Sequence, residues 1–269
     1  MSRTHPVAIV KGAGCLGTGA AYRLHKAGFR VLCLDLARPL ALRRMAAFAS
    51  ALYDGRITVD GVQAERALFA DEVVYIWQRG GVAVMADPSL RTLDIFRPDV
   101  LVDAIMAGCN TGTAIDQAPV VVACGPGFTA GEDCHAVIET QRGHDLGRVL
   151  WHGSAAPTAD TNGKTYDEDA PCLLRAPCDG TFYGRRAIGD TVKAGDIIAT
   201  IGRTPAPATC DGVVRGLLHD DVPATAGLKI AEIDPRGEVR HCFSISDRAL
   251  AVGGGVLEAV FTLRDKWRS

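Results

Sequence analysis

Short apolar runs that alternate with helical patterns organise the first half of the chain. The apolar runs lie at 7–10, 29–36, 82–85, 100–105 and 119–124, and the helical patterns lie at 20–27, 39–53 and 71–79. Runs of this length between helices are typical of strands in a parallel sheet that is covered on both faces. The pattern predicts an α/β fold with a Rossmann-like, doubly wound and mostly parallel sheet. The runs at 136–140 and 148–151 are candidates for its closing strands.

A second pattern begins after residue 171 and repeats at an offset of 32 residues. Ala176-Pro-Cys-Asp-Gly180 matches Ala208-Thr-Cys-Asp-Gly212, and ten of the 27 residues from 176 to 202 are identical 32 positions later. Each copy predicts short strands joined by Asp-Gly and Gly-led turns. Two such halves resemble the β barrel-sandwich hybrid of lipoyl and biotinyl carrier domains. The carrier function is not implied, because the presenting hairpin, Ile201–Pro207, contains no lysine.

These changes of pattern divide the chain into four parts. We expect a Rossmann-like nucleotide- or cofactor-binding domain at 1–155, a linker at 156–171, the barrel-sandwich hybrid at 172–235 and a helical tail at 236–269. The linker is rich in small, polar and turn-forming residues. In the tail, Ser246 is a candidate N-cap and Gly253–Gly255 is expected to interrupt the helix. The apolar face of the tail predicts that it returns to the N-terminal domain.

Composition and charge exclude several classes of function. The chain is 48% hydrophobic with a formal net charge of −2, so it has the means to form a core but lacks the basic surface of nucleic-acid or polybasic membrane binding. It also lacks a signal-peptide pattern and a long apolar stretch, so we expect a cytoplasmic protein without a membrane partner. Its nine cysteines contain no C-x-x-C pair, which favours reduced thiols over a disulfide framework.

A glycine-rich loop carries the clearest candidate chemistry. Gly12, Gly14 and Gly17 form a G-x-G-x-x-G motif directly after a predicted strand and before a predicted helix. In this context the glycines admit a pyrophosphate to backbone N–H groups, and an acid at the end of the second strand accepts a ribose hydroxyl. The cofactor-binding residues predicted here are Gly12, Ala13, Gly14, Cys15, Gly17 and Asp35. A tight strand–helix corner without a ligand is the alternative.

Further candidates follow later strands of the same sheet. Gly125, Gly127 and Phe128 are predicted to bind the ligand because loops at the carboxyl ends of strands line the crevice of open α/β sheets. The predicted catalytic residues are Cys15, Cys124, His135 and Glu139. A thiol near a helix N-terminus is a candidate nucleophile or soft ligand, and a His–carboxylate pair is a candidate base. Inert buried thiols and a hydrogen-bonded histidine are the alternatives, and the spacing predicts no metal site.

Several phrases, taken together, resemble one family. They are Val10-Lys-Gly-Ala-Gly14, Gly125-Pro-Gly-Phe-Thr-Ala-Gly131, His135-Ala-Val-Ile-Glu-Thr140, Ile245-Ser-Asp247 and Gly253-Gly-Gly-Val-Leu-Glu258. They resemble the YqeB-type selenium-dependent molybdenum hydroxylase system proteins over nearly the whole chain. The resemblance implies an accessory protein in the maturation of molybdenum hydroxylases of the xanthine dehydrogenase type. One departure is Cys15, where the family pattern leads us to expect an acidic residue.

This resemblance sets the expected ligand and partners. The ligand would be the molybdenum cofactor, as molybdopterin or its dinucleotide form, and the partner would be a client molybdenum hydroxylase or another maturation protein. The same glycine loop and Asp35 also fit an NAD(P)-dependent oxidoreductase. A third hypothesis is a non-catalytic scaffold that docks the client with an empty loop. Whether the chain catalyses a reaction or forms a homo-oligomer stays open at this stage.

Overall fold

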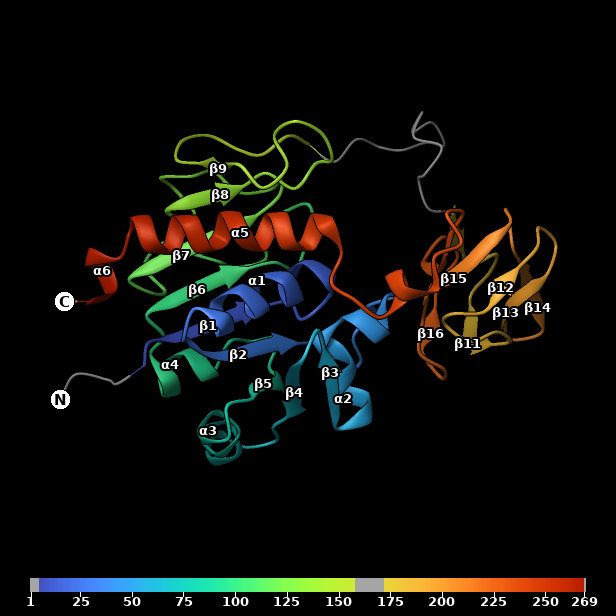
Figure 1. The fold of residues 1–269 in the computed structure, drawn as a ribbon, viewed down its shortest axis with the longest axis horizontal. Coiled ribbons are helices and arrows are strands. Elements are labelled where there is room, and N and C mark those ends of the chain that lie inside the picture. The colour runs from blue at the N-terminus through green and yellow to red at the C-terminus, as the bar shows by residue number, and fades with distance from the viewer. Residues whose placement is uncertain (1–4, 158–171, 269) are drawn as a thin grey trace. The chain divides into compact units, whose positions relative to one another are not determined.

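The chain folds into two compact units, which are described separately (Figure 1). A computed structural model describes residues 5–157 and 172–268. Unit 1 consists of residues 1–39, 48–159 and 245–269, and unit 2 consists of residues 40–47 and 160–244. Most of the linker predicted at 156–171 lies outside the described residues. None of the described helices is long and apolar enough to cross a membrane.

A nine-stranded sheet forms the centre of unit 1, in the order β3-β4-β5-β2-β1-β6-β7-β8-β9. Its strands are β1 (Val7–Lys11), β2 (Arg30–Asp35), β3 (Arg56–Val59), β4 (Val62–Arg66), β5 (Val82–Ala86), β6 (Val100–Asp103), β7 (Val120–Cys124), β8 (Ala136–Ile138) and β9 (Val149–Leu150). The pairs from β4 to β8 are parallel, whereas β3 pairs with β4 and β9 pairs with β8 in antiparallel fashion. The central strands are buried throughout, as their continuous apolar runs predict.

The expected fold class, a Rossmann-like doubly wound sheet with a barrel-sandwich hybrid, is wrong. The large sheet is mixed, because antiparallel strands close both of its edges. The hairpin β3–β4 at one edge was missed, although its Asp60-Gly61 turn is a typical hairpin signal and both residues adopt positive φ. The connection from β6 to β7 also lacks the helix that a doubly wound sheet would place there, since residues 104–119 form no helix.

Helices cover the two faces of this sheet. They are α1 (Cys15–Lys26), α2 (Ala51–Asp54), α3 (Ala70–Gln78), α4 (Thr92–Phe96), α5 (Asp247–Thr262) and α6 (Asp265–Arg268). One core cluster joins Val73 of α3 and Phe96 of α4 to Ile9, Leu101 and Val121 of the central strands. The tail helix α5 packs along α1 and against β7, β8 and β9 (Figure 1). The short helix α4 was not expected from the sequence.

The glycines of the tail do not interrupt α5, contrary to the prediction. The helix runs continuously from the N-cap Ser246, whose side chain accepts a hydrogen bond from the Ala249 N–H. A Cβ on Gly253 would collide with the carbonyl oxygen of Gly19 in α1, and a Cβ on Gly255 would collide with that of Gly147. These glycines therefore let neighbouring backbone approach a continuous helix, and this packing outweighs their low helix propensity.

The helix predicted over 39–53 is also wrong. The segment forms 3₁₀ helices at Arg44–Ala46 and Phe48–Ser50 before the short helix α2. Its first part, 40–47, belongs to unit 2, where the Leu42 carbonyl oxygen accepts a hydrogen bond from the Leu217 N–H at 2.8 Å. The guanidinium of Arg43 also forms a bidentate ion pair with Glu232. Tertiary contacts of this kind override local helix propensity.

Unit 2 contains two four-stranded antiparallel sheets of matching order, β10-β17-β15-β12 and β14-β13-β11-β16. Their strands are β10 (Cys172–Arg175), β11 (Gly180–Gly184), β12 (Thr191–Val192), β13 (Ile197–Ile201), β14 (Thr204–Pro207), β15 (Gly212–Leu217), β16 (Pro223–Ala224) and β17 (Lys229–Asp234). The 32-residue offset carries each strand of one sheet onto the equivalent strand of the other. The described strands form two separate sheets rather than a closed barrel, which corrects the barrel-sandwich expectation.

The cysteines of unit 2 also depart from expectation. Cys172 and Cys210 form a disulfide, whereas the sequence favoured reduced thiols throughout. Across the repeat, Cys172 corresponds to Thr204 and Cys210 corresponds to Cys178. The Cys178 thiol lies 3.4 Å from the Thr204 hydroxyl, so the contact equivalent to the disulfide is a thiol–hydroxyl pair. The absence of a C-x-x-C motif gave no indication of this pairing, because it joins residues 38 positions apart.

Candidate functional site

The candidate site lies at the carboxyl ends of β1 and β6, where the order of strands in the sheet reverses. The chain continues from β1 to β2 on one side, whereas β6 lies on the other side of β1. In open α/β sheets the loops that diverge at such a point leave a crevice for ligands. The glycine loop after β1 and the loops after β6 and β7 all start at this edge.

The three glycines of the motif have different roles. Gly12 has φ of +94°, and a Cβ there would lie 2.9 Å from the Ala104 carbonyl carbon. A Cβ on Gly17 would collide with the carbonyl oxygen of Gly12. Gly14 differs, because a Cβ at this position would meet no heavy atom within 4 Å. Gly12 and Gly17 therefore serve packing within the protein, and Gly14 is the glycine with open space beside it.

Helix α1 begins at this open position. Gly14 is its N-cap, with extended backbone angles, and its first turn contains no acidic residue. The first N–H groups of a helix have no partner within the helix, and they give its N-terminus a partial positive charge. Cys15 begins the helix, and its side chain is half-buried. The geometry of the loop suits an anionic group next to Gly14.

Asp35 lies at the end of β2, but its carboxylate is used to hold the loop. Its Oδ2 accepts a hydrogen bond from the Ala13 N–H at 2.7 Å, and its Oδ1 accepts one from the Leu36 N–H at 2.7 Å. Burial raises the pKa of Asp35, and these two hydrogen bonds oppose that shift. The carbonyl oxygen of Ala13 is also occupied, by the Ala49 N–H and the Thr18 hydroxyl. Ala13 itself is fully buried.

A buried ion pair between β1 and β6 was missed by the sequence reasoning. The Lys11 ammonium lies 3.0 Å from Asp103 Oδ2, and only 4% of Lys11 and 1% of Asp103 are exposed. The hydroxyls of Thr111 and Thr113 each accept a hydrogen bond from Lys11 Nζ at 3.0 Å. The Thr113 hydroxyl donates in turn to Asp103 at 2.6 Å. The available signal was a charged residue at the end of each of two apolar strands, at Lys11 and Asp103.

The loop after β7 contacts the loop after β6. Gly125, with φ of +80°, would place a Cβ 2.9 Å from Met106 Cε, and Gly127, with φ of +100°, would place one 2.6 Å from Cys109 Cα. Phe128 is buried in the core cluster. Gly125, Gly127 and Phe128, which were predicted to bind the ligand, thus lie at the expected edge of the sheet. There they contact other residues of the protein.

The cysteines near this edge differ in accessibility. Cys124 is buried, and burial raises the pKa of its thiol, an effect that the charge of Asp103 increases. Cys134 is also buried, and burial raises the pKa of its thiol to about 12. Cys15 is half-buried and Cys109 is exposed. A raised pKa keeps a thiol protonated and unreactive, which argues against Cys124 and Cys134 as nucleophiles. The accessible thiols near this edge are those of Cys15 and Cys109.

His135 and Glu139 flank β8, and each makes its own backbone contacts. The Nδ1 atom of His135 accepts a hydrogen bond from the Val121 N–H at 3.0 Å. Partial burial lowers its pKa, and the charge of Lys266 lowers it further. The Glu139 carboxylate is 6% exposed and accepts hydrogen bonds from the N–H groups of Thr140, Gln141 and Ala156. In the described part of the chain, His, Cys, Asp and Glu side chains form no group of three suited to a metal ion.

Comparison with known proteins identifies one curated relative. No family model matches the chain. The relative is "Uncharacterized protein YqeB" of Escherichia coli strain K12, which is 46% identical over 259 residues. The alignment includes 96% of this chain and 48% of that protein, so the chain spans about half the length of the relative. This similarity supports the YqeB-type family.

The solved structures that resemble the chain do so only weakly. The product-bound ectoine utilization protein EutE (DoeB) from Ruegeria pomeroyi has a TM-score of 0.27 and 13% identity, with 86% of this chain and 85% of that chain covered. An aspartoacylase family protein from Mesorhizobium loti has a TM-score of 0.24 and 10% identity, with 86% of each chain covered.

Proposed function

We propose that the chain binds a phosphate-bearing anion at the glycine loop, and that in this capacity it is an accessory protein in the maturation of molybdenum hydroxylases. The observation that carries the binding proposal is the open space beside Gly14, at the start of a helix with no acidic residue in its first turn. The first N–H groups of α1 and the helix dipole favour a negative group there. The sequence resemblance supplies the biological setting.

The molybdenum cofactor, as molybdopterin or its dinucleotide form, is the candidate ligand. The part of it that the loop fits is the phosphate, because the space beside Gly14 lies at the start of α1, whose first turn contains no acidic residue. The described residues offer no group of three metal-binding side chains. In this proposal the metal is held by the ligand itself. Cys15 is the predicted catalytic residue that lies in the same first turn.

An NAD(P)-dependent oxidoreductase is less favoured by the geometry. Such an enzyme would use the acid after the second strand to accept a ribose hydroxyl. The Asp35 carboxylate already accepts hydrogen bonds from two backbone N–H groups, and one of them belongs to the glycine loop. A ribose at this position would have to compete with contacts that hold the loop in shape. The scaffold hypothesis differs from both in predicting that changes at Gly14 have no functional effect.

A pair of substitutions at Gly14 tests the binding proposal. Gly14 has φ of −67° and open space beside it, so both Gly14→Asp and Gly14→Asn should fold. Either side chain is a good N-cap and should stabilise α1 by a few tenths of a kcal/mol, at about the level known for such caps. The Asp variant alone adds a negative charge where the phosphate would lie. Isothermal titration calorimetry with inorganic pyrophosphate measures the difference.

We expect pyrophosphate to bind the wild type and the Asn variant to within about threefold of each other. Binding to the Asp variant should weaken by about tenfold or more, because the introduced carboxylate would lie next to the pyrophosphate and both carry negative charge. Absence of pyrophosphate binding to the wild type, or equal binding to both variants, would overturn the proposal. The maturation role is tested separately. A molybdenum hydroxylase is produced in cells whose only copy of this protein is the Asp or the Asn variant, and the activity of the hydroxylase is measured.

A further inference from the structure

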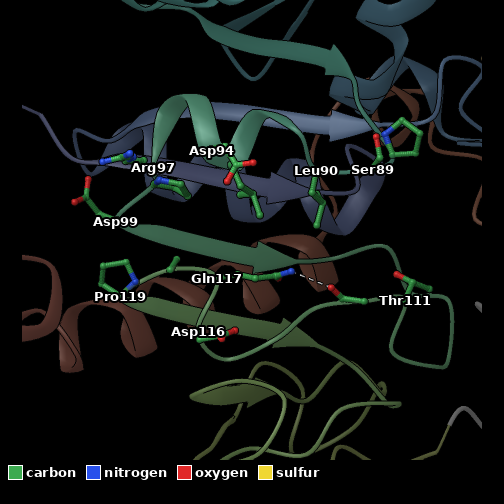
Figure 2. Close-up of a pocket in the computed structure, with 14 residues that line it drawn as sticks. Ser89, Leu90, Asp94, Arg97, Asp99, Thr111, Asp116, Gln117 and Pro119 are labelled. Atoms are coloured by element: carbon green, nitrogen blue, oxygen red, sulfur yellow. Dashed lines mark hydrogen bonds between the residues drawn. The ribbon is translucent and has the colours of Figure 1, made fainter.

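A groove in unit 1 separates α4 from the segment 111–119 (Figure 2). Its lining carries charges of both signs, because the carboxylates of Asp94 and Asp116 share it with the guanidinium of Arg97. This mixture of charges specifies no class of ligand. Unit 2 contains a group with more specific chemistry, the disulfide between Cys172 and Cys210.

The disulfide joins the first residue of β10 to the turn that precedes β15. These two strands lie on either side of β17 in the sheet order β10-β17-β15-β12. Cys172 is paired with Ile233 of β17, and Val213 of β15 is paired with Asp234 of the same strand. The disulfide therefore crosses the carboxyl end of β17 and connects the two strands that flank it.

The 32-residue repeat provides an equivalent sheet without a cross-link at this place. In that sheet β14 and β11 flank β13, and Thr204 and Cys178 occupy the positions of Cys172 and Cys210. The Cys178 thiol lies 3.4 Å from the Thr204 hydroxyl, so the equivalent contact is noncovalent. The architecture of the sheet therefore does not require the disulfide.

The two halves differ in how the outer strand is connected to its neighbour. β14 follows β13 through a turn of residues 202–203, whereas β10 and its neighbour β17 are separated by residues 176–228. β10 is an edge strand, and among the described strands it pairs with β17 alone. Leu174 is the one fully buried residue of β10. An edge strand with so little burial and no local turn depends on the cross-link to stay in place.

Both cysteines of the disulfide are half-buried, so a small thiol can reach them. A thiolate of glutathione attacks one sulfur, and the other cysteine leaves as a thiolate. A second glutathione thiolate attacks the mixed disulfide and releases the remaining cysteine. Two glutathione thiols are thereby oxidised to one glutathione disulfide, and the protein disulfide is reduced to two thiols. The two protons that glutathione loses are taken up by the two cysteines.

We propose that Cys172 and Cys210 form a reversible thiol–disulfide exchange site that controls the attachment of β10 to unit 2. In the oxidised protein the cross-link holds β10 on β17. In the reduced protein β10 leaves the sheet edge more often, while the other strands of unit 2 keep their pairing. The proposal does not depend on the ligand proposed for the glycine loop.

The exchange chemistry is tested on the full chain with glutathione. The folded protein is treated with millimolar reduced glutathione, its thiols are alkylated, and mass spectrometry identifies the modified cysteines. We expect Cys172 and Cys210 to become alkylated, and to be protected again once oxidised glutathione is added in excess. A disulfide that resists reduction in the folded protein, or that does not re-form, would overturn the proposal.

Native-state hydrogen exchange tests the effect on β10. Its amides should exchange about tenfold faster or more after reduction, because the cross-link no longer limits opening of the strand. The amides of β13 and β15 should change by less than about twofold. Equal acceleration throughout unit 2 would show that the disulfide stabilises the whole unit, and unchanged exchange in β10 would show that it does not hold this strand. Either result overturns the proposal.

Two variants separate the disulfide from the other thiol of unit 2. Cys172→Thr reproduces the pair formed by Thr204 and Cys178, so it should fold. Its β10 amides should exchange as in the reduced wild type and should not respond to glutathione. Cys178→Ser is the matched control, because it changes the position equivalent to Cys210 and keeps the disulfide. It should respond as the wild type does. Protection of β10 in Cys172→Thr equal to that in the oxidised wild type, or loss of the response in Cys178→Ser, would contradict the assignment.

Discussion

His135 illustrates how one residue can hold two adjacent strands in register. Its Nδ1 accepts a hydrogen bond from the Val121 N–H of β7, while the His135 N–H donates to the Val121 carbonyl oxygen at 2.8 Å. The first bond requires an unprotonated Nδ1. Partial burial and the charge of Lys266 favour the same neutral form, because they lower the pKa of His135. The contacts of this histidine thus serve the structure, and its catalytic role stays a prediction.

The pKa shift of His135 predicts a dependence of stability on pH. Because the folded-state pKa lies below the usual value of about 6.5, the unfolded chain binds more protons once the pH falls toward that value. The stabilising contribution is fully present above about pH 6.5 and is lost as the pH decreases toward the folded-state pKa. The His135→Asn variant keeps an acceptor near the position of Nδ1 and cannot titrate. Its free energy of unfolding should therefore fall less than that of the wild type between about pH 7 and pH 5.

Urea denaturation at several pH values measures this difference. His25, whose pKa is also lowered by burial, is present in both proteins, so its contribution cancels. The His135→Ala variant is the control for the hydrogen bond, and it should be less stable than His135→Asn by about 1 kcal/mol at every pH, because neither variant titrates at this position. Parallel pH profiles for the wild type and His135→Asn would contradict the prediction.

Individual residues also show why the site was only partly predictable. The motif correctly placed a glycine loop between a strand and a helix, because Gly12, Gly14 and Gly17 mark places where backbone must approach closely. The sequence could not tell whether that approach is to a ligand or to protein, and Gly12 and Gly17 approach protein. Lys11 was missed because its partner, Asp103, lies 92 positions away and only the pairing of β1 with β6 brings them together.

At the scale of elements, the packing of α1 against α5 predicts opposite effects at adjacent glycines. Gly253→Ala should destabilise the protein, because the new Cβ would collide with the Gly19 carbonyl, and overpacking of this kind typically costs about 1–3 kcal/mol. Gly254→Ala should stabilise it by about 0.5–1 kcal/mol, because a Cβ there meets nothing within 4 Å and alanine favours the helix. Thermal and urea unfolding measure both effects. The same sign for the two variants would argue against close packing at Gly253.

The internal repeat leads to a prediction about a second disulfide. Thr204 and Cys178 occupy the positions equivalent to Cys172 and Cys210, and their side chains are already 3.4 Å apart. Thr204→Cys should therefore form a disulfide with Cys178 under oxidising conditions and stabilise unit 2 by about 2–4 kcal/mol. Thiol titration should find one free thiol fewer than in the wild type, whereas the Thr204→Ser control should leave the count unchanged. A free thiol at position 204 would show that the two halves are less alike than their strand order indicates.

Elements with a strong local signal were the most predictable. The buried strands at 7–10, 82–85 and 119–124 and the helix at 71–79 were expected close to their observed bounds, because continuous apolar runs and helical periodicity are local properties. The errors arose where distant contacts decide. Residues 40–47 belong to unit 2, and Gly253 lies against α1. Neither contact can be predicted from the residues next to it in the sequence.

At the scale of the whole molecule, the division into two units predicts that two ion pairs, each with a buried carboxylate, stabilise the units separately. Lys11 and Asp103 pair inside unit 1, and Arg43 and Glu232 pair inside unit 2. Removing one partner of a buried pair such as Lys11–Asp103 leaves the other charge without compensation, which typically costs about 3–5 kcal/mol. The cost at Arg43 should be smaller, because Arg43 is half-buried and Arg215 also interacts with Glu232. Because the four residues are divided evenly between the units, each pair offers a local probe of one unit.

Lys11→Met should therefore lower the stability of unit 1 alone, and Arg43→Met should lower that of unit 2 alone. The Arg43 variant is the more informative of the two. Arg43 belongs to the segment 40–47 of unit 2, and this segment directly follows residues of unit 1 in the sequence. Native-state hydrogen exchange resolves the two effects, with the amides of β1 reporting on unit 1 and those of β15 reporting on unit 2. Exchange that accelerates equally in both strands for either variant would show that the units unfold as one cooperative structure. Acceleration confined to β15 in Arg43→Met would show that residues 40–47 stabilise unit 2 as an integral part of it.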